Sequence, residues 1–469
     1  MMQKNTFVAL RDGTQISVPD DLSKMSHYVL SEQGDWFEDE IHFVRRFIEP
    51  GMQALDIGAN YGLYTCAILK KFNGTGHLWC FEPTPDTASA LRQSIEKNNF
   101  QERVTLIEAG LSNQCGSATF YTSPNSELNS LTKFDGLAQD NAHTIQLKTL
   151  DSCLEEYQWG KLDFIKLDAE GEEVRILEAG QKTLQELSPL VMFELKHGND
   201  INHELIRSFE ALGFGIYRMI PGLEVLVPVV VESGFDSFQL NLFACKPDRA
   251  ELLKAKGLLV ELMPALKCAT PIQAEQLPRL AAFSTLKLAP EDATGESYFS
   301  LLASFLAACN DSLPIQQRYQ HLLFAHDLVK PIWEAKETSI ERLSTIARVA
   351  FDFGSRQLGI AILEFLIKRY FQTAGAIEVR DAFVQPCAQM DAVRIGSNLV
   401  TWLCSGVLDA MIRKHAYSCY FTGPQMIPFM KRLEQTRYLH PDIAQRIVTM
   451  KMAIQASSNT VAHKESENS

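Results

Sequence analysis

Short apolar runs alternate with amphipathic stretches along the first half of the chain. Apolar runs bounded by polar residues or glycines predict strands, and apolar positions that recur every three or four residues predict helices. Strands are expected at residues 53–57, 76–81, 104–109, 162–167, 190–195, 215–220 and 239–245. Helices are expected at 36–48, 63–72, 85–98, 172–187 and 203–212. This alternation is typical of an α/β fold with a doubly wound sheet whose central strands are parallel.

The pattern changes near residue 246, where strand signals fade and helical ones take over. One apolar helix face is formed by Ile340, Leu343, Ile346, Ala347 and Ala350. We therefore expect an all-α C-terminal domain. Residues 350–366 are similar to a tetratricopeptide helix pair, but no second copy follows at a fixed period.

These changes set the expected domain boundaries. Asp12-Gly13 between two short apolar runs predicts a hairpin. Prolines and polar clusters after the α/β part indicate a linker, and the polar final residues are typical of disorder. The expected parts are an N-terminal hairpin and lead-in (1–35), the α/β domain (36–247), a linker with the first helices (248–300), a helical, repeat-like domain (301–455) and a disordered tail (456–469).

The composition narrows the class of protein. The 469 residues are 46% hydrophobic and 22% charged, as in globular proteins, and this length favours two domains. A formal net charge of −13 argues against nucleic acid as the main partner, because phosphate binding draws on clustered Lys and Arg. We find no signal peptide, no membrane span and no C-x-x-C pair among the ten cysteines, so we expect a cytoplasmic protein with free thiols.

The strongest candidate site is a glycine-rich turn between the first expected strand and the helix after it. It contains Asp56, Gly58, Asn60 and Gly62. Gly58 permits a tight turn and the close approach of a ligand, and Gly62 lets the helix start pack near the strand. The dinucleotide fingerprint G-x-G-x-x-G would need a glycine where Asn60 stands. A carboxylate beside backbone groups that no side chain covers can bind the ammonium and carboxylate of S-adenosylmethionine. Such a site is less suited to the pyrophosphate of a dinucleotide.

A second acid, Glu82, follows the next expected strand, twenty residues past Gly62. An acidic side chain at that strand end can accept hydrogen bonds from both ribose hydroxyls of an adenosine. Because NAD-binding folds use the same geometry, an NAD-dependent oxidoreductase is one alternative. The chain lacks the third glycine of the fingerprint and a suitably placed Tyr-x-x-x-Lys pair, which counts against that alternative.

A carboxylate-rich turn ends the fourth expected strand. Asp168 and Glu170 would lie at the carboxyl edge of the sheet, facing the transferable methyl group. Lys166 lies inside an apolar strand and needs a carboxylate partner if it is buried. Glu172 and Glu173 are interpreted only as acids at a helix N-terminus, stabilised there by the helix dipole.

Two further candidates, Glu194 and His197, end the fifth expected strand. A carboxylate, or a histidine with a near-neutral pKa, can take a proton from a substrate hydroxyl. We expect Asp168 to be this base, with Glu170, Glu194 and His197 behind it. Alternatively, Asp168, Glu170 and Glu194 hold a divalent cation, for which their oxygens would suit magnesium or calcium. The preferred prediction includes no metal.

The order of these motifs resembles the FkbM family of methyltransferases over about residues 37–246. The matching segments are Asp56–Thr65, Phe81–Pro83, Leu111-Ser112 followed by Gly116, Thr149–Asp151 and Ile165–Glu173. The resemblance implies a Rossmann-like class I methyltransferase fold, S-adenosylmethionine as cofactor, and methylation of a sugar or polyketide hydroxyl. It also implies an adenine-edge contact near Gly110, Leu111 and Ser112, although family members usually have alanine where this chain has Gly110.

We therefore expect an S-adenosylmethionine-dependent O-methyltransferase that acts on a hydroxyl of a sugar, glycan or polyketide-like acceptor. Residues 116–147 and 221–238 are candidate walls around that acceptor. The alternative is a non-catalytic adaptor with a degenerate methyltransferase module and a protein-binding helical domain. The intact glycine turn and Glu82 argue against degeneration. In either case the helical domain is a candidate surface for a protein partner or for homodimerisation.

Overall fold

The computed structural model describes residues 4–121, 142–197, 200–231, 234–264, 266, 297–371 and 377–467. The chain divides by its contacts into two units. The first comprises Met1–Met219, Leu240–Leu259 and Met452–Ser469, and the second comprises Ile220–Gln239 and Val260–Lys451. The domain boundaries expected from the sequence stay a prediction.

The main sheet is mixed and belongs to the first unit, except for residues 220 and 225–228, which are grouped with the second. In sheet order its strands are β14 (Val225–Pro228), β13 (Gly215–Ile220), β15 (Asn241–Cys245), β10 (Leu190–Glu194), β9 (Phe164–Leu167), β3 (Gln53–Ile57), β4 (His77–Phe81) and β5 (Val104–Ile107). From β10 to β5 neighbouring strands are parallel, and β15 pairs antiparallel with both β10 and β13. The expected α/β fold with parallel central strands is confirmed.

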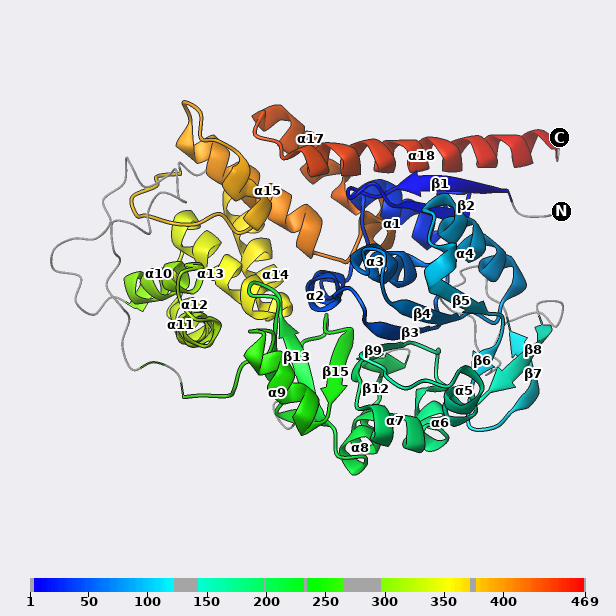
Figure 1. The fold of residues 1–469 in the computed structure, drawn as a ribbon. Helices are drawn as coiled ribbons and strands as arrows, with labels where there is room; N and C mark the ends of the chain where they lie inside the picture. Colours follow the sequence, from blue (N-terminus) through cyan, green and yellow to red (C-terminus); the bar gives the residue numbers. More distant parts are fainter. Residues whose placement is uncertain are drawn as a thin grey trace. The chain divides into compact units, whose positions relative to one another are not determined.

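Helices cover both faces of this sheet (Figure 1). They are α1 (Met25–Gln33), α2 (Glu40–Phe47), α3 (Leu63–Lys71), α4 (Pro85–Lys97), α5 (Leu150–Tyr157), α6 (Glu173–Glu178), α7 (Gln181–Leu187), α8 (His203–Ala211) and α9 (Pro247–Ala255). Figure 1 shows α2, α3 and α4 on one side and α6, α7 and α8 on the other. The helix expected at 172–187 is two helices, which are separated at Ala179 and Gly180.

Aromatic side chains fill the core on each side of the sheet. On one side, the rings of Phe43 and Phe47 from α2 lie 5.0 Å from Phe243 and 5.9 Å from Phe164, respectively. On the other, Phe193 of β10 lies 4.7 Å from Phe209 of α8. Such rings bury large apolar areas, which stabilises the layers that hold the strand ends in place.

Three small sheets accompany the main one. They are the hairpin β1 (Asn5–Ala9) with β2 (Gln15–Pro19), the pair β11 (Lys196–His197) with β12 (Asp200–Ile201), and β6 (Gly110–Leu111), β8 (Ala142–Lys148) and β7 (Gly116–Tyr121) in that sheet order. The N-terminal hairpin is as expected, with Gly13 at φ +86 in its turn. Residues 122–141 of the first candidate wall, 116–147, lie outside the described residues.

Helices follow one another along the second unit, and the last of them continues from Met452 into residues grouped with the first unit. They are α10 (Ser297–Ala308), α11 (Ile315–Asp327), α12 (Val329–Glu334), α13 (Ile340–Phe353), α14 (Arg356–Leu366), α15 (Leu399–Lys414), α16 (Cys419–Thr422), α17 (Ile427–Thr436) and α18 (Pro441–Glu467). The all-α C-terminal region is confirmed, and the five apolar residues of the expected face of α13 are all buried. Side chains of α18 are described only as far as residue 455.

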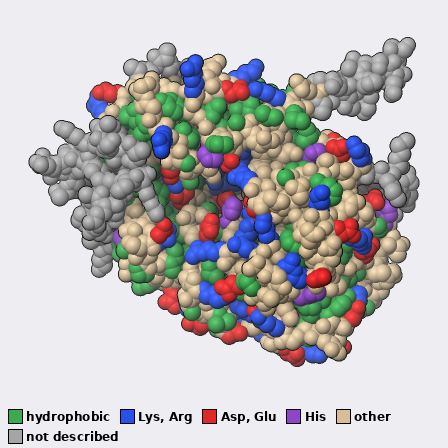
Figure 2. All heavy atoms as spheres, turned by 45° about the horizontal axis from the view of Figure 1, so that its top comes forward, with side chains coloured by type: hydrophobic (Ala, Val, Ile, Leu, Met, Phe, Trp, Pro, Cys, Tyr) green, Lys and Arg blue, Asp and Glu red, His purple; other side chains and the backbone are tan. Residues whose placement is uncertain are grey.

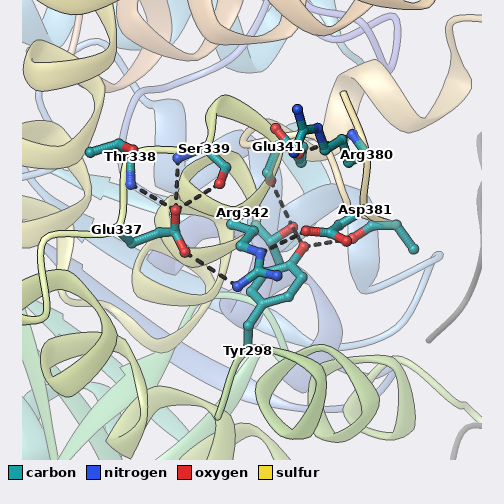
Figure 3. A network of polar contacts seen from close by, with 10 residues as sticks. Tyr298, Glu337, Thr338, Ser339, Glu341, Arg342, Arg380 and Asp381 are labelled. Atoms are coloured by element: carbon teal, nitrogen blue, oxygen red, sulfur yellow. Dashed lines mark hydrogen bonds and ion pairs between the residues drawn. The ribbon is translucent and has the colours of Figure 1, made fainter. Parts of the chain in front are cut away.

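A polar network fastens the start of α13 to its neighbours (Figure 3). The Arg342 guanidinium donates to Asp381 at 2.7 Å and lies 5.0 Å from the centre of the Tyr298 ring. The Tyr298 hydroxyl donates to the Ala382 carbonyl at 2.6 Å. Glu341, buried at 2% exposure, accepts a hydrogen bond from the Arg380 backbone. These contacts hold α10, α13 and residues 380–382 together.

The surface mixes charges of both signs. On the face in Figure 2, Lys and Arg side chains lie among Asp and Glu side chains and hydrophobic ones. Every cysteine in the described ranges is a free thiol. Among the helices of the described ranges, none is both long enough and apolar enough to cross a bilayer.

Candidate active site

The residues singled out in the sequence follow the ends of four adjacent strands, β4, β3, β9 and β10. Ile57 is in register with both Phe81 and Leu167, and Leu167 with Phe193. Because these strands are parallel, their carboxyl ends share one edge of the sheet, where ligands of such folds bind. The topology therefore brings the glycine turn, Glu82, Asp168 and Glu194 to the same edge.

Lys166 is the centre of a buried ionic cluster at this edge. Its ammonium lies 2.9 Å from Asp168 Oδ2 and 3.7 Å from Asp56 Oδ1, and it donates to the Gly58 carbonyl at 3.0 Å. Burial alone would lower the pKa of Lys166, but the carboxylates of Asp168 and Asp56 outweigh it and raise the pKa. The expected carboxylate partner of Lys166 is thus confirmed, and the cluster ties the ends of β3 and β9 together.

Asp56 faces the protein interior. It is fully buried, and its Oδ2 accepts the Thr65 hydroxyl at 2.6 Å. Burial raises the pKa of Asp56, and the Lys166 ammonium opposes that rise. The contacts of Asp56 make it a residue that orients Lys166 and the start of α3.

Position 58 requires a glycine for a structural reason that the sequence does not reveal. A Cβ on Gly58 would lie 1.8 Å from the Asp168 carbonyl oxygen, so the ends of β3 and β9 meet backbone to backbone. Gly58 also has φ +75, a conformation that glycine adopts without strain. A Cβ on Gly62 would lie 2.4 Å from Leu91, so this glycine lets α3 pack against α4.

Glu82 is buried beside the glycine turn. One oxygen accepts the Asn60 backbone N–H at 3.0 Å and the other accepts the Thr84 backbone N–H at 2.9 Å. The Thr84 side chain also hydrogen-bonds this carboxylate. A carboxylate has about four lone-pair sites, so these contacts do not use all of its accepting capacity. Burial raises the pKa of Glu82 to about 7, against the lowering effect of these hydrogen bonds.

The predicted adenine-edge residues lie between β5 and β7. The Ser112 hydroxyl donates to Glu172 Oε2 at 2.6 Å, and its backbone N–H donates to the Lys148 carbonyl at 3.0 Å. Leu111 is buried, and a Cβ on Gly110 would lie 3.2 Å from Leu147. Glu172 therefore positions Ser112, a role that its interpretation as a helix-terminal acid missed.

The turn after β9 has an unusual backbone. Glu170 and Gly171 both have positive φ, at +50 and +101, which is rare for a residue such as glutamate. The Glu173 carboxylate holds this turn by accepting the N–H groups of Ala169 at 2.8 Å and Gly171 at 3.1 Å. The buried Glu173 therefore fixes the loop that carries Asp168 and Glu170.

Glu194 lies in a strongly acidic environment. Burial, followed by the negative charges of Asp168, Glu170 and Glu173, raises its pKa to about 10. The Asp168 side chain is 35% exposed, so its carboxylate can be reached from solvent although one oxygen is paired with Lys166. The side chain of His197 lies outside the described part of the structure.

Glu38 belongs to the same edge and was not predicted. Its Oε2 accepts the Tyr64 hydroxyl at 2.7 Å and the Asn241 amide at 3.0 Å, and its Oε1 accepts the Trp36 indole N–H at 3.0 Å. Burial raises the pKa of Glu38, and the charge of Asp168 adds to the rise. In sequence Glu38 opens an acidic run before a helix, a pattern that indicates a helix start and no more.

Acids outnumber cations at this edge. Several carboxyl groups interact electrostatically, and the ammonium of Lys166 lies near them. These carboxyl groups belong to Glu38, Asp168, Glu170, Glu173 and Glu194. Within the described ranges, no group of three His, Cys, Asp or Glu residues has an arrangement that could hold a metal ion. Burial and the negative charge of Asp168 raise the pKa values of Glu38 and Glu194, and that negative charge favours a ligand with positive charge.

Comparisons with known proteins identify proteins that are similar to part of this chain. The family model described as the methyltransferase FkbM domain matches residues 56–216. The hexuronic acid methyltransferase AglP of Haloferax volcanii is 28% identical over 145 residues, which cover 31% of this chain and 56% of that protein. The 2-O-methyltransferase NoeI of Sinorhizobium fredii is 25% identical over 150 residues, which cover 29% of this chain and 60% of that protein. The chain thus spans little more than half of each relative's length.

One solved structure aligns with part of this chain. The methyltransferase FkbM from Methylobacillus flagellatus KT aligns with 44% of this chain and 50% of its own, at a TM-score of 0.29 and 16% sequence identity. The family match begins at Asp56, runs through β3, β4, β9 and β10, and ends in β13, so it includes the edge described above. By the family match alone, residues 56–216 are a methyltransferase FkbM domain, and the helical region lies outside the match.

Proposed function

We propose that the chain is an S-adenosylmethionine-dependent O-methyltransferase whose acceptor is a sugar or a similar hydroxyl compound. The observation that carries the proposal is the acidic edge, with Glu82 on one side of the glycine turn and the Lys166 cluster on the other. The excess of carboxyl groups there favours a cationic cofactor over the negatively charged pyrophosphate of NAD. The family match, the hexuronic acid methyltransferase AglP and the 2-O-methyltransferase NoeI support the same reaction class.

The residues present fit an adenosyl cofactor. Glu82 would accept the ribose hydroxyls through the lone pairs that Asn60 and Thr84 leave available. The backbone around Asn60 and the pocket edge near Gly110, Leu111 and Ser112 would hold the remaining groups. When bound, S-adenosylmethionine would supply a methyl carbon activated by a positively charged sulfur, so that a C–O bond to the acceptor can form as the C–S bond breaks and the neutral thioether leaves.

The acids at the edge would handle the acceptor's proton. Asp168 would accept it, because its carboxylate is reachable from solvent and Lys166 holds its orientation. A positioned base of this kind typically contributes roughly 10²–10⁴ in rate. Glu194, whose raised pKa keeps it neutral in the free protein, would donate a hydrogen bond to the acceptor oxygen, and Glu170 would line the same side. His197 remains a further candidate.

The experiment that tests this function follows a tritiated methyl group. Full-length protein would be incubated with labelled S-adenosylmethionine and two acceptor sets, neutral glycosides and uronic acids. We expect label transfer that falls roughly 10²–10⁴-fold in Asp168→Asn. The matched control is Asp86→Asn, an exposed acid in the first turn of α4, which should keep wild-type transfer. Equal transfer in Asp168→Asn and wild type would contradict the role of Asp168.

A further inference from the structure

Residues 221–239 connect β13 and β15 and include β14, the edge strand of the same sheet, yet by their contacts they are grouped with the helical unit. Residues 221–238 were expected to form a wall beside the acceptor. Two anchors in its described part, one near each end, tie it to α13, α14 and the residues after α15. The anchors are made of residues that the proposed reaction does not use.

The first anchor is at Gly222. Its backbone N–H donates to the Asp352 carbonyl near the end of α13, at 2.8 Å. A Cβ on Gly222 would lie 2.5 Å from the Asp352 Cβ, so only a glycine lets the segment run this close to the helix. The beginning of the segment is therefore held by backbone contact.

The second anchor is at Asp236 and Phe238. Asp236 Oδ2 accepts the Gln357 backbone N–H at 2.9 Å, and the Phe238 carbonyl accepts the Tyr417 hydroxyl at 3.0 Å. The Arg356 guanidinium lies 4.6 Å from the ring of Phe238 and 4.9 Å from that of Tyr417. Two hydrogen bonds and a cation that lies beside two aromatic rings thus fix this end.

The chain passes from this anchor into the acidic edge within three residues. The Leu240 carbonyl accepts the Leu195 N–H at 2.7 Å. Asn241 then pairs in register with Glu194 and donates its amide to Glu38. Three residues span at most about 11 Å, so Phe238 and Asn241 are joined by a short tether.

We propose that the helical domain positions the acceptor side of the methyltransferase site, with Arg356 and Tyr417 as positioning residues that hold Phe238 and thereby place Asn241 against Glu38. The catalytic meaning of this inference rests on the proposed function, whereas the mechanical link does not. The helical region is on this account a required part of the enzyme. A free-standing protein-binding module would have no need to grip a loop of the sheet.

The test is hydrogen–deuterium exchange on the full-length protein, alongside a titration with S-adenosylmethionine. We expect Tyr417→Phe and Arg356→Ala to speed exchange of peptides covering 236–245 and 190–195 about five- to tenfold, as the loss of one such contact predicts. Arg356→Lys should restore part of the protection, because an ammonium can also lie over aromatic rings. The matched control is Tyr370→Phe, which removes a phenol bonded to the Thr338 carbonyl at 2.5 Å elsewhere in the helical unit.

Several outcomes would overturn the inference. Unchanged exchange at 240–245 would show that the anchor does not reach β15. Acceleration spread evenly over α10, α11 and α13, or an equal effect of Tyr370→Phe at 240–245, would show a merely structural role. If wild-type protein fails to bind S-adenosylmethionine, the proposed function fails while the exchange result stands by itself.

Discussion

The ammonium of Lys166 lies 2.9 Å from the carboxylate of Asp168, at the end of a strand that is otherwise apolar. The same ammonium reaches Asp56 at 3.7 Å and the Gly58 carbonyl at 3.0 Å. One buried cation therefore holds the candidate base and the glycine turn in a common arrangement. Its removal should affect both stability and ligand binding.

We predict that Lys166→Met destabilises the protein by about 3–5 kcal/mol, because Asp56 and Asp168 lose their buried counter-charge. Urea unfolding followed by circular dichroism measures this change. The matched control is Lys182→Met, since Lys182 is an exposed partner of Glu155 and should leave the urea midpoint unchanged. A Lys166→Met midpoint within error of wild type would show that the cluster contributes nothing to stability.

Gly58→Ala should destabilise the protein by roughly 3 kcal/mol or more, since the new Cβ would overlap the Asp168 carbonyl and the backbone has positive φ. Gly74→Ala is the matched control. Gly74 also has positive φ, at +95, but a Cβ there would meet nothing within 4 Å. Its expected cost is about 1–2 kcal/mol of backbone strain. Equal losses in the two variants would mean that β3 and β9 do not meet as closely as described.

Glu194 should make stability depend on pH. The folded protein keeps this proton up to about pH 10, whereas an ordinary glutamate releases it near 4.5. The folded state therefore loses stability as pH rises from about 4.5 to about 10, by at most about 1.4 kcal/mol per pH unit. Glu194→Gln mimics the protonated acid and should become more stable than wild type as pH rises, in thermal melts between pH 5 and 9. Glu204→Gln, an exposed change on α8, should leave the wild-type pH curve unaltered.

Much of the fold could be predicted because its signals are local. The apolar runs of β3, β4, β9 and β10 and the glycine turn between β3 and α3 are all visible within ten residues. The helix α1 was missed because its buried positions include polar residues such as Ser26 and Glu32, which weaken the amphipathic pattern.

The rest of the site depends on contacts between distant residues. Glu38 is linked to Tyr64, 26 residues away, and to Asn241, 203 residues away, so nothing near Glu38 marks it. Gly58 was recognised as a turn glycine, but its neighbour, the Asp168 carbonyl, belongs to another strand. Lys166 was the exception, since a buried ammonium requires a carboxylate wherever that lies in the sequence.

The most direct test of the central claim is a calorimetric titration of the full-length protein with S-adenosylmethionine, S-adenosylhomocysteine and NAD. We predict micromolar binding of both adenosyl ligands and none of NAD. Glu82→Ala should weaken adenosyl binding about a hundredfold, because two hydrogen bonds to a charged group are lost. Folded protein that binds neither adenosyl ligand, or that binds them equally well without the Glu82 carboxylate, would contradict the assignment of this edge as a methyl-donor site.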